Sequence, residues 1–288
     1  MRPLFYTGLV FNLFLILFAG CARNELESVS TSSPRIVSLA PSITEIICAI
    51  GAEKMLVGRT SACDYPPGIV KNIPVVGGFG KPALEALFNV QPTLVLDVDL
   101  EDEAVILSLK RAGIKHQRVK CSRVDDIPMA IKKIGVLVGM EQPANELGER
   151  LARQIADMRA AAQKARETGV PPKVFAEIWS DPLMTAGSGS LISELVTLAG
   201  GTNIADEIPK DYFNVSPEWV VALDPDIIVC FDPADAKTVA SRAGWANMKA
   251  VKTGRIYSKL DNNLIERPGP RVLEGIAILR DCIIRKAE

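Results

Sequence analysis

Short apolar runs alternate with amphipathic stretches from Arg35 onward. Such alternation is typical of α/β units, in which the strands of a buried sheet are followed by helices that cover it. In the first unit, Ser42 is placed to cap a helix and Gly51 to end it. In this half of the chain we expect strands at residues 36–39, 94–96 and 115–119, and helices at residues 42–50 and 106–112.

The second half of the chain repeats this plan. It has an apolar run at residues 174–178, followed by a helix that ends at Gly200. Glu194 stands six residues before Gly200, and Glu45 stands six residues before Gly51. The same helix therefore occurs once in each half, with a glutamate at the same place.

A second pair of glutamates also matches between the halves. Glu85 lies seven residues before Pro92, and Glu218 lies seven residues before Pro225. Each proline leads into an apolar run that reads as a strand. Two matched pairs in the same order favour two similar α/β lobes.

A long helix is predicted between these lobes, within residues 139–170. Pro143 suits a first helical turn and Gly169 a C-terminal stop, so the helix has ~25 residues and is roughly 37 Å long. Because bending it would break backbone hydrogen bonds, we expect a rigid link between a lobe of residues 35–138 and a lobe of residues 171–288, with a ligand cleft between them. An ordinary surface helix of one domain is the alternative.

The N-terminus has the layout of an export signal. Arg2 is followed by an apolar stretch at residues 4–18, which is shorter than the roughly 20 residues that a membrane helix needs. Small residues directly before Cys21 resemble the bacterial lipobox, which predicts a lipoprotein signal peptide at residues 1–21, lipidation of Cys21 and a flexible tether at residues 22–34. A signal cleaved without lipidation and an uncleaved anchor are the alternatives. The protein is thus expected to be extracytoplasmic.

Composition narrows the classes of function. The formal net charge of −1, from 33 basic and 34 acidic residues, provides no electrostatic basis for binding nucleic acid or an anionic membrane face. A hydrophobic content of 48% suffices for one large core or two moderate ones. We expect a monomer whose contact with the membrane is the lipid anchor alone.

Residues suited to catalysis or metal binding are scarce. The single histidine, His116, lies on a predicted strand and is expected to be exposed. The loop of residues 187–190 lacks the Lys-Ser/Thr of a phosphate loop, so capping of the next helix by Ser190 is the better interpretation. The acidic residues 97–103 lack the glycine and glutamate of a calcium loop, which favours a solvated loop. The sequence predicts no enzyme, no catalytic residue, no cofactor and no metal site.

Binding of a small molecule needs less than catalysis does. It needs a cleft with aromatic walls and a few polar groups, and in α/β folds these lie in loops that follow strands. Trp219 and Trp245 fall within apolar helical patterns and are assigned to the core. The aromatic candidates in predicted loops are Tyr65, Phe79, Trp179, Tyr212 and Phe213, together with the segment 262–271.

At these motifs the chain resembles the helical-backbone solute-binding proteins that serve ABC importers of cobalamin, ferric siderophores and haem. The resemblance covers residues 35–284 and includes the sequences Arg-Ile-Val-Ser-Leu-Ala-Pro-Ser at 35–42, Asp-Tyr-Pro-Pro at 64–67 and Glu-Arg-Pro-Gly-Pro-Arg at 266–271. Asp-Tyr-Pro-Pro and Arg-Pro-Gly-Pro-Arg look most like the cobalamin binders. The resemblance implies two α/β lobes joined by one long helix.

The resemblance also implies the partners of the protein. In this family a glutamate on each lobe docks into basic pockets of the permease dimer, which works with ATPase subunits, and the matching positions are Glu85 and Glu218. Two carboxylates on equivalent surfaces suit a two-fold symmetric partner. The alternative is that each carboxylate only favours the first turn of its helix.

Ligand residues carry over as Tyr65, Phe79 and Tyr212 for the aromatic walls and as Asn263 and Arg267 for polar contacts. Phe79 and Tyr212 replace tryptophans of the cobalamin binders, and Asn263 replaces an aspartate. These matches imply that the transported ligand is cobalamin or another corrinoid. A siderophore binder, a haem binder with Tyr65 on the iron, and an extracytoplasmic enzyme are the alternatives.

Cysteine pairing is left open. With Cys21 lipidated, five cysteines remain, so at least one of them has no partner within the chain. A Cys230–Cys282 bridge is conceivable. The disulfide that the resemblance implies for the last helix cannot form, because Ala199 occupies the partner position of Cys282.

Overall fold

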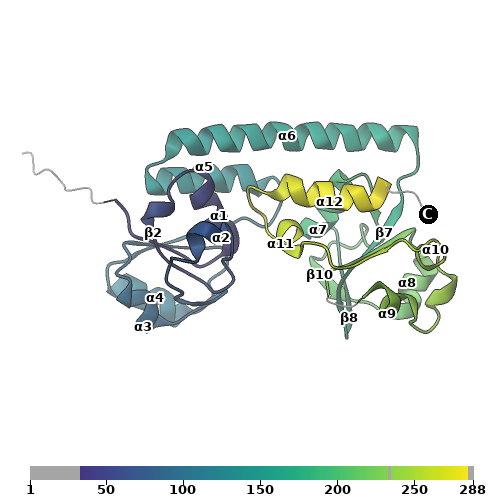
Figure 1. The fold of residues 1–288 in the computed structure, drawn as a ribbon, viewed down its shortest axis with the longest axis horizontal. Helices are drawn as coiled ribbons and strands as arrows, with labels where there is room; N and C mark the ends of the chain where they lie inside the picture. The colour runs from purple at the N-terminus through teal and green to yellow at the C-terminus, as the bar shows by residue number, and fades with distance from the viewer. Residues whose placement is uncertain (1–32, 233–234, 285–288) are drawn as a thin grey trace, which may run out of the picture. The chain divides into compact units, whose positions relative to one another are not determined.

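The computed structural model describes residues 33–232 and 235–284. The predicted signal peptide at residues 1–21, the lipidation site Cys21 and most of the tether lie outside the described residues. Within the described ranges, no helix has both the length and the apolar content needed to cross a membrane. The described residues belong to one compact unit, and it contains two lobes, each built on its own sheet (Figure 1).

The N-terminal lobe is built on a parallel sheet with the strand order β2-β1-β5-β6. Ile36 and Leu96 contribute to the apolar core on one face, whereas Val37 and Val95 contribute to the core on the other. This alternation follows from the two-residue period of a strand, and it means that helices must cover both faces. The strands are β1 (Ile36–Ser38), β2 (Leu56–Arg59), β5 (Leu94–Asp97) and β6 (Lys115–Arg118), with a separate hairpin of β3 (Gly77–Gly78) and β4 (Lys81–Pro82).

Helices cover this sheet as the alternation requires. On one face Ile43 of α1 and Ile131 of α5 pack into the same core, and on the other face Leu87 of α3 and Leu109 of α4 do so. The predicted capping role of Ser42 is wrong, because the helix begins one residue earlier and Ala40 is its N-cap. The helices of this lobe are α1 (Pro41–Ala49), α2 (Pro67–Val70), α3 (Leu84–Asn89), α4 (Glu103–Arg111), α5 (Asp126–Val138) and the short 3-10 helix Glu53–Met55.

The C-terminal lobe has a six-stranded sheet with the order β10-β8-β7-β11-β12, in which β9 also pairs with β7. Its centre repeats the N-terminal lobe, since β7 pairs in parallel with β11 just as β1 pairs with β5. The antiparallel strands β8 and β10 have no counterpart in the first lobe. The strands are β7 (Lys173–Ser180), β8 (Leu183–Ala186), β9 (Thr202–Asn203), β10 (Tyr212–Asn214), β11 (Ile227–Cys230) and β12 (Ile256–Tyr257).

The helices of the second lobe also lie on both faces of its sheet. Leu195 of α7 and Leu279 of α12 pack into one core, while Val220 of α8, Val239 of α9 and the fully buried Trp245 belong to the other. Ser190 caps α7 by accepting a hydrogen bond from the Ser193 amide, as predicted. The helices are α7 (Leu191–Leu198), α8 (Pro217–Leu223), α9 (Ala236–Ala240), α10 (Lys249–Lys252), α11 (Asn262–Ile265), α12 (Val272–Ile284) and the 3-10 helix Trp245–Asn247.

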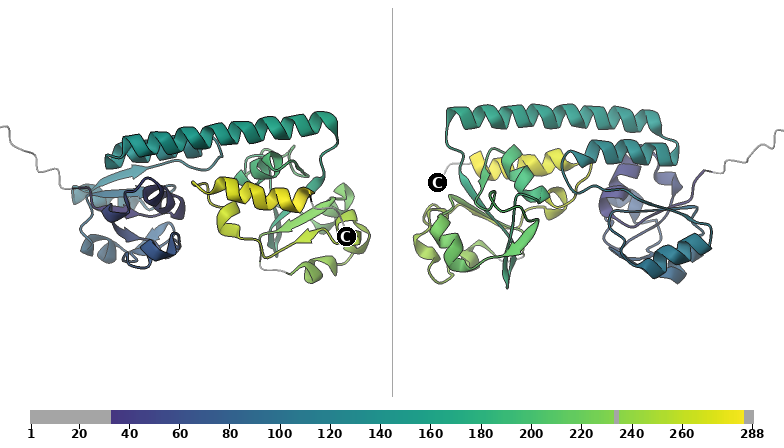
Figure 2. Two further views of the ribbon diagram at one scale, coloured as in Figure 1. Left: turned by 45° about the horizontal axis from the view of Figure 1, so that its top comes forward. Right: turned by 180° about the vertical axis from the view of Figure 1, so that it is seen from behind.

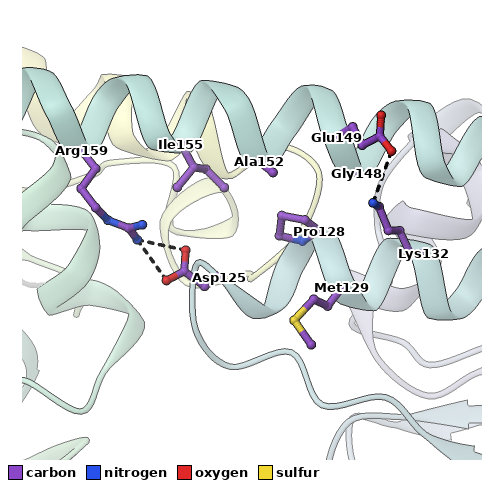
Figure 3. A pocket seen from close by; sticks show the side chains of 9 residues that line it. All are labelled: Asp125, Pro128, Met129, Lys132, Gly148, Glu149, Ala152, Ile155 and Arg159. Carbon is purple, nitrogen blue, oxygen red and sulfur yellow. Dashed lines mark hydrogen bonds and ion pairs between the residues drawn. The ribbon is translucent and has the colours of Figure 1, made fainter.

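A single helix of 28 residues, α6 (Glu141–Thr168), joins the lobes. It packs along α5 and then against α7, so it contacts both lobes (Figure 2). The seam with α5 is tight at Gly148, where an added Cβ would lie 3.1 Å from the Pro128 carbonyl oxygen. Ion pairs Lys132–Glu149 and Arg159–Asp125 bridge the two sides of this seam (Figure 3). The predicted α/β class with two similar lobes joined by a long helix is confirmed.

The lobes also share one apolar core. Ile43 of α1, Ile131 of α5, Leu151 of α6 and Leu195 of α7 all belong to a single cluster of buried residues. The link between the lobes is therefore a helical layer and not α6 alone. Because interiors of this kind are close-packed, bending between the lobes would open voids in it.

Two polar residues of the N-terminal lobe are more enclosed than predicted. The side chain of His116 is 16% exposed and hydrogen-bonds to Asp97. Asp97 is buried and also accepts a hydrogen bond from the Leu100 amide, so the first residue of the acidic cluster is structural rather than solvated. The prediction of an exposed His116 was wrong, because β6 packs against α4. The prediction of a solvated acidic loop fails at Asp97 alone among its acidic residues, since Asp99, Glu101, Asp102 and Glu103 are exposed.

Candidate functional site

A cavity of about 970 Å³ lies between the lobes. It is lined by the N-terminal lobe at Pro41, Ser42, Ala62, Phe79, Val98, Asp99 and Lys120–Arg123, and by the C-terminal lobe at Gly189–Leu191, Asp211, Tyr212, Asn263 and Glu266–Pro268. The structure thus has a cleft where the two-lobed fold predicts one. The groove between α5 and α6 is smaller, at about 300 Å³, and has no aromatic residue in its lining.

Topology explains why these residues meet. Pro41, Val98 and Lys120 lie within three residues after the ends of β1, β5 and β6, which are parallel neighbours in the sheet. The carboxyl ends of parallel strands lie at the same edge, so the loops after them converge there. The sequence prediction named residues after other strands but missed the segment after β6, residues 120–123. The same rule, applied to the predicted strand at 115–119, would have found it.

The aromatic walls of the cleft come from opposite lobes. Phe79 stands in the hairpin between β3 and β4 and is 49% exposed, and Tyr212 on β10 is 47% exposed. Both line the cavity, as predicted. Partial burial, together with the nearby carboxylate of Glu266, raises the pKa of the Tyr212 phenol, which is therefore protonated at neutral pH. Each wall offers half of an aromatic side chain to a ligand.

Two predicted aromatic contacts lie outside this lining. Trp179, near the end of β7, is 51% exposed, and its indole N–H donates to the carbonyl oxygen of Asp181. Tyr65 is covered on one face by Arg271, whose guanidinium carbon lies 3.7 Å from the ring centroid. The structure does not place either ring in the wall of the cavity. Loop position alone could not show this, because it does not tell which way a loop faces.

The two predicted polar contacts line the cavity but already have protein partners. Arg267 donates to both oxygens of Asp64, at 2.6 and 3.2 Å, and to Glu45 at 3.3 Å. Asn263 donates to the same Asp64 carboxylate at 3.2 Å. Desolvation lowers the pKa of Arg267, but the hydrogen bonds and charges of the two carboxylates outweigh it and raise the pKa. Arg267 is thus a cation whose charge is already balanced by Asp64 and Glu45.

The remaining charges of the cleft are mostly negative. Four charged residues that line the cavity have no side-chain hydrogen bond or ion pair with any described residue. They are Asp99, Asp211, Glu266 and Lys120. The other lining cation, Arg123, is paired with Glu194. Three carboxylates therefore face the cleft against one ammonium group. Glu266 belongs to a sequence motif singled out above, but its position in the cleft is visible only in the structure.

Buried thiols add little reactivity to the cleft. Cys121 lines the cavity and donates to the carbonyl oxygen of Pro268 at 3.0 Å. Burial raises the pKa of this thiol to about 12. Cys230 is also a free thiol, so the conceivable Cys230–Cys282 bridge is not formed. In the described part of the chain, no group of three or more His, Cys, Asp or Glu residues could hold a metal ion.

The glutamates of the second repeated pair lie away from the cavity. Glu85 is in the first turn of α3 and Glu218 in the first turn of α8, and both are exposed. Backbone hydrogen bonding at the start of α8 lowers the pKa of Glu218, so it is ionised. The two carboxylates occupy equivalent positions, because α3 precedes β5 just as α8 precedes β11.

Comparison with known proteins identifies the family. Residues 36–262 match the periplasmic binding protein family. The chain is 32% identical over 267 residues to the uncharacterized ABC transporter substrate-binding lipoprotein YvrC of Bacillus subtilis, which covers 91% of this chain and 83% of that protein. It is 25% identical over 241 residues to the vitamin B12-binding protein of Pectobacterium atrosepticum, with 83% and 84% covered.

Solved structures agree with this assignment. The periplasmic heme-binding protein RhuT from Roseiflexus sp. RS-1 superposes with a TM-score of 0.76 at 28% identity, covering 89% of this chain and all of that one. The vitamin B12-binding protein BtuF of Vibrio cholerae has a TM-score of 0.71 at 23% identity, with 87% and 96% covered, and so supports the fold alone. The chain therefore belongs to the periplasmic binding protein family, as an ABC transporter substrate-binding protein of the type whose members bind vitamin B12, heme or siderophores.

Proposed function

We propose that this protein captures cobalamin or a related corrinoid outside the cytoplasmic membrane and delivers it to the permease of an ABC importer. Its function is capture between the lobes, without catalysis and without a resident cofactor. The cavity of about 970 Å³ supports a ligand of tetrapyrrole size, because ligand pockets commonly measure ~300–1,000 Å³. Phe79 and Tyr212 provide aromatic contact on opposite sides of such a ligand.

The charge of the cleft is the observation that favours a corrinoid. Among the described residues that line the cavity, Asp99, Asp211 and Glu266 have no side-chain hydrogen bond or ion pair, and Lys120 is the one lining cation that is likewise unpaired. Haem carries two propionate groups and many ferric siderophores are anionic, so these ligands would meet like charge at close range. The corrin ring of cobalamin carries neutral amide side chains instead. Amide N–H groups donate to carboxylates in charge-assisted hydrogen bonds, which this cleft can accept.

The axial ligands that haem iron and cobalamin cobalt require also favour a corrinoid. Haem iron is usually held by His, Cys, Met or Tyr. In the described lining, the candidates are Tyr212 and Cys121, and the pKa of each is raised, so the anionic form that binds iron is disfavoured. A cobalamin brings the axial ligands of its cobalt with it. Haem binding is the second candidate, because the solved heme-binding relative is 28% identical to this chain.

Delivery would use the exposed glutamates and the membrane anchor. Glu85 and Glu218 would dock on basic pockets of the two permease subunits, each through one lobe. Lipidation of Cys21 would hold the protein, as a monomer, at the membrane surface. Replacing both glutamates with glutamine should leave ligand affinity unchanged and abolish stimulation of the transporter's ATPase. The variant C21S should move the protein from the membrane fraction to the soluble fraction.

Isothermal titration tests the ligand directly. A chain of residues 22–288 is titrated with cyanocobalamin, cobinamide, haem and a ferric siderophore. One-to-one binding of the corrinoids at micromolar affinity or tighter, with weaker binding of haem, supports the proposal. Absence of heat with both corrinoids would sink it, and tight haem binding would establish the second candidate instead.

A further inference from the structure

The glutamates of the first repeated pair, Glu45 and Glu194, lie at equivalent places in the two lobes. Glu45 is on α1 and Glu194 on α7, each about one turn into its helix. The first turns of these helices contribute Ser42 and Leu191 to the lining of the cavity. Both glutamates therefore lie directly beneath the floor of the cleft.

Glu45 is bound by arginines of the opposite lobe. Arg271, just before α12, donates from Nε to Oε2 at 2.9 Å and from Nη2 to Oε1 at 2.7 Å. Arg267 donates to Oε1 at 3.3 Å and also holds Asp64 of the N-terminal lobe. The side chain of Glu45 is 3% exposed, so the contact is nearly dry. Its partners are more than 220 residues away in the chain.

Glu194 makes the reciprocal contact. Arg123 of the N-terminal lobe lies 2.8 Å (Nε) and 2.6 Å (Nη2) from its Oε1, and the amide of Val124 donates to its Oε2 at 2.9 Å. The guanidinium of Arg123 also donates to the carbonyl oxygens of Ser188 and Gly189. This second contact is more exposed than the first, at 20% for the Glu194 side chain.

We propose that these two contacts are equivalent clamps that set the separation of the lobes at the floor of the cleft. The N-terminal lobe supplies Glu45 and Arg123, and the C-terminal lobe supplies Glu194 with Arg267 and Arg271, so a movement that separates the lobes must stretch both contacts. The helical layer that includes α6 lies at one side of the lobes, so it holds them together on that side. Arginine and carboxylate in a two-point contact fix orientation as well as distance, which a single apolar contact does not.

The clamps explain the repeat in the sequence. A glutamate six residues before the glycine stop is kept in both halves because each places a carboxylate under the cleft, facing the other lobe. Glu45 and Glu194 are thus positioning residues, which shape the cleft without lining it. For the proposed importer function, on which this consequence rests, a permease that pulls the lobes apart through Glu85 and Glu218 would have to break both clamps to release the ligand.

Distance measurement between the lobes tests the proposal without any ligand, so its outcome is independent of what the protein carries. Spin labels are attached through a ketone-bearing amino acid introduced at Glu103 on α4 and Lys237 on α9, both of which are exposed and outside the cavity. This chemistry leaves the native thiols untouched. Pulsed electron paramagnetic resonance then reports the distribution of distances between the lobes in residues 22–288.

The variants R123M and E194M should each broaden this distribution and shift it to longer distance. The double variant R123M/E194M should move it by less than the sum of the two single effects, because both changes break the Arg123–Glu194 contact while each also removes a hydrogen bond of its own. The matched control is R159M, which removes an arginine from an ion pair with Asp125 that does not cross the cleft. Distributions unchanged from R159M, or additive effects of the two single changes, would overturn the clamp.

The first clamp provides an independent check. Because Glu45 is more buried than Glu194, E45Q should widen the distribution more than E194Q does. Circular dichroism confirms that each variant is folded before labelling. If E45Q does not fold, the variants of the more exposed Arg123–Glu194 contact still test whether the clamps set the separation of the lobes. Equal, unchanged distributions in folded E45Q and E194Q would contradict the proposal.

Discussion

Removing the aromatic walls of the cleft should weaken corrinoid binding by a predictable amount. Full burial of a phenylalanine side chain contributes ~1.5–3 kcal/mol, and Phe79 is already half covered, since 49% of it is exposed. A ligand that covers the remainder would gain about 0.7–1.5 kcal/mol from burial. Favourable contact between ring systems adds ~0.5–1.5 kcal/mol. The variant F79A should therefore lose about 1–3 kcal/mol, which is roughly 5- to 150-fold in Kd.

Isothermal titration with cyanocobalamin measures this loss, and Tyr212 should behave like Phe79 because its exposure is 47%. The matched control is W179A. Trp179 is 51% exposed, yet it does not line the cavity, so its removal should leave Kd within about two-fold of the unchanged protein. A W179A loss as large as that of F79A, or no loss in F79A, would refute the assignment of the cleft walls.

Three further outcomes are expected. Glu177 is fully buried and accepts two hydrogen bonds from Arg242, at 2.6 and 2.7 Å. The variant E177Q should therefore lower the free energy of unfolding by about 3 kcal/mol, as measured by urea titration. A loss below ~1 kcal/mol would contradict a buried ion pair at this position. Desolvation raises the pKa of Glu266, although the charge of Arg267 opposes this shift. The contribution of Glu266 to the free energy of unfolding is therefore complete below pH ~4 and declines as the pH rises through the pKa of the folded state. The variant E266Q should flatten this decline, and a stability-against-pH curve that E266Q leaves unchanged would argue against the assignment. The pKa of Cys121 is raised from 9.0 to about 12. Iodoacetamide should therefore modify this thiol on the order of 10³-fold more slowly at pH 8 in the native protein than in urea. Mass spectrometry of the peptide that contains Cys121 measures the two rates, and comparable rates would exclude a buried thiol.

Local pattern was enough to predict the architecture. The strand expected at residues 36–39 is β1, and the long helix α6 lies within the predicted segment 139–170. These elements follow from the spacing of apolar residues a few positions apart, which the chain carries in every short window. The internal repeat was also visible, because equal spacing between glutamate and glycine survives in the sequence. Membership of a two-lobed binding-protein family was inferred separately, from the resemblance of motifs such as Asp-Tyr-Pro-Pro at 64–67 and Glu-Arg-Pro-Gly-Pro-Arg at 266–271.

Exposure of individual side chains was harder to predict. Phe79 and Trp179 have the same signal in the sequence, an aromatic residue in a predicted loop, yet one lines the cavity and the other does not. His116 lies on a polar stretch but is enclosed beside Asp97. The direction in which a loop faces depends on what packs against it, and that information is distributed over distant parts of the chain.

The sequence by itself determined the two lobes, the helix between them and the types of residue available for a cleft. Only the tertiary structure decided which charges remain open to a ligand. Arg267, a candidate ligand contact, meets Asp64 across 203 residues, and Glu45 meets Arg271 across 226. Secondary structure arises from neighbours in the chain, whereas an ion pair between lobes arises from the packing of complete sheets and helices. A cation's identity can therefore be seen in the sequence, but its partner is set by the fold.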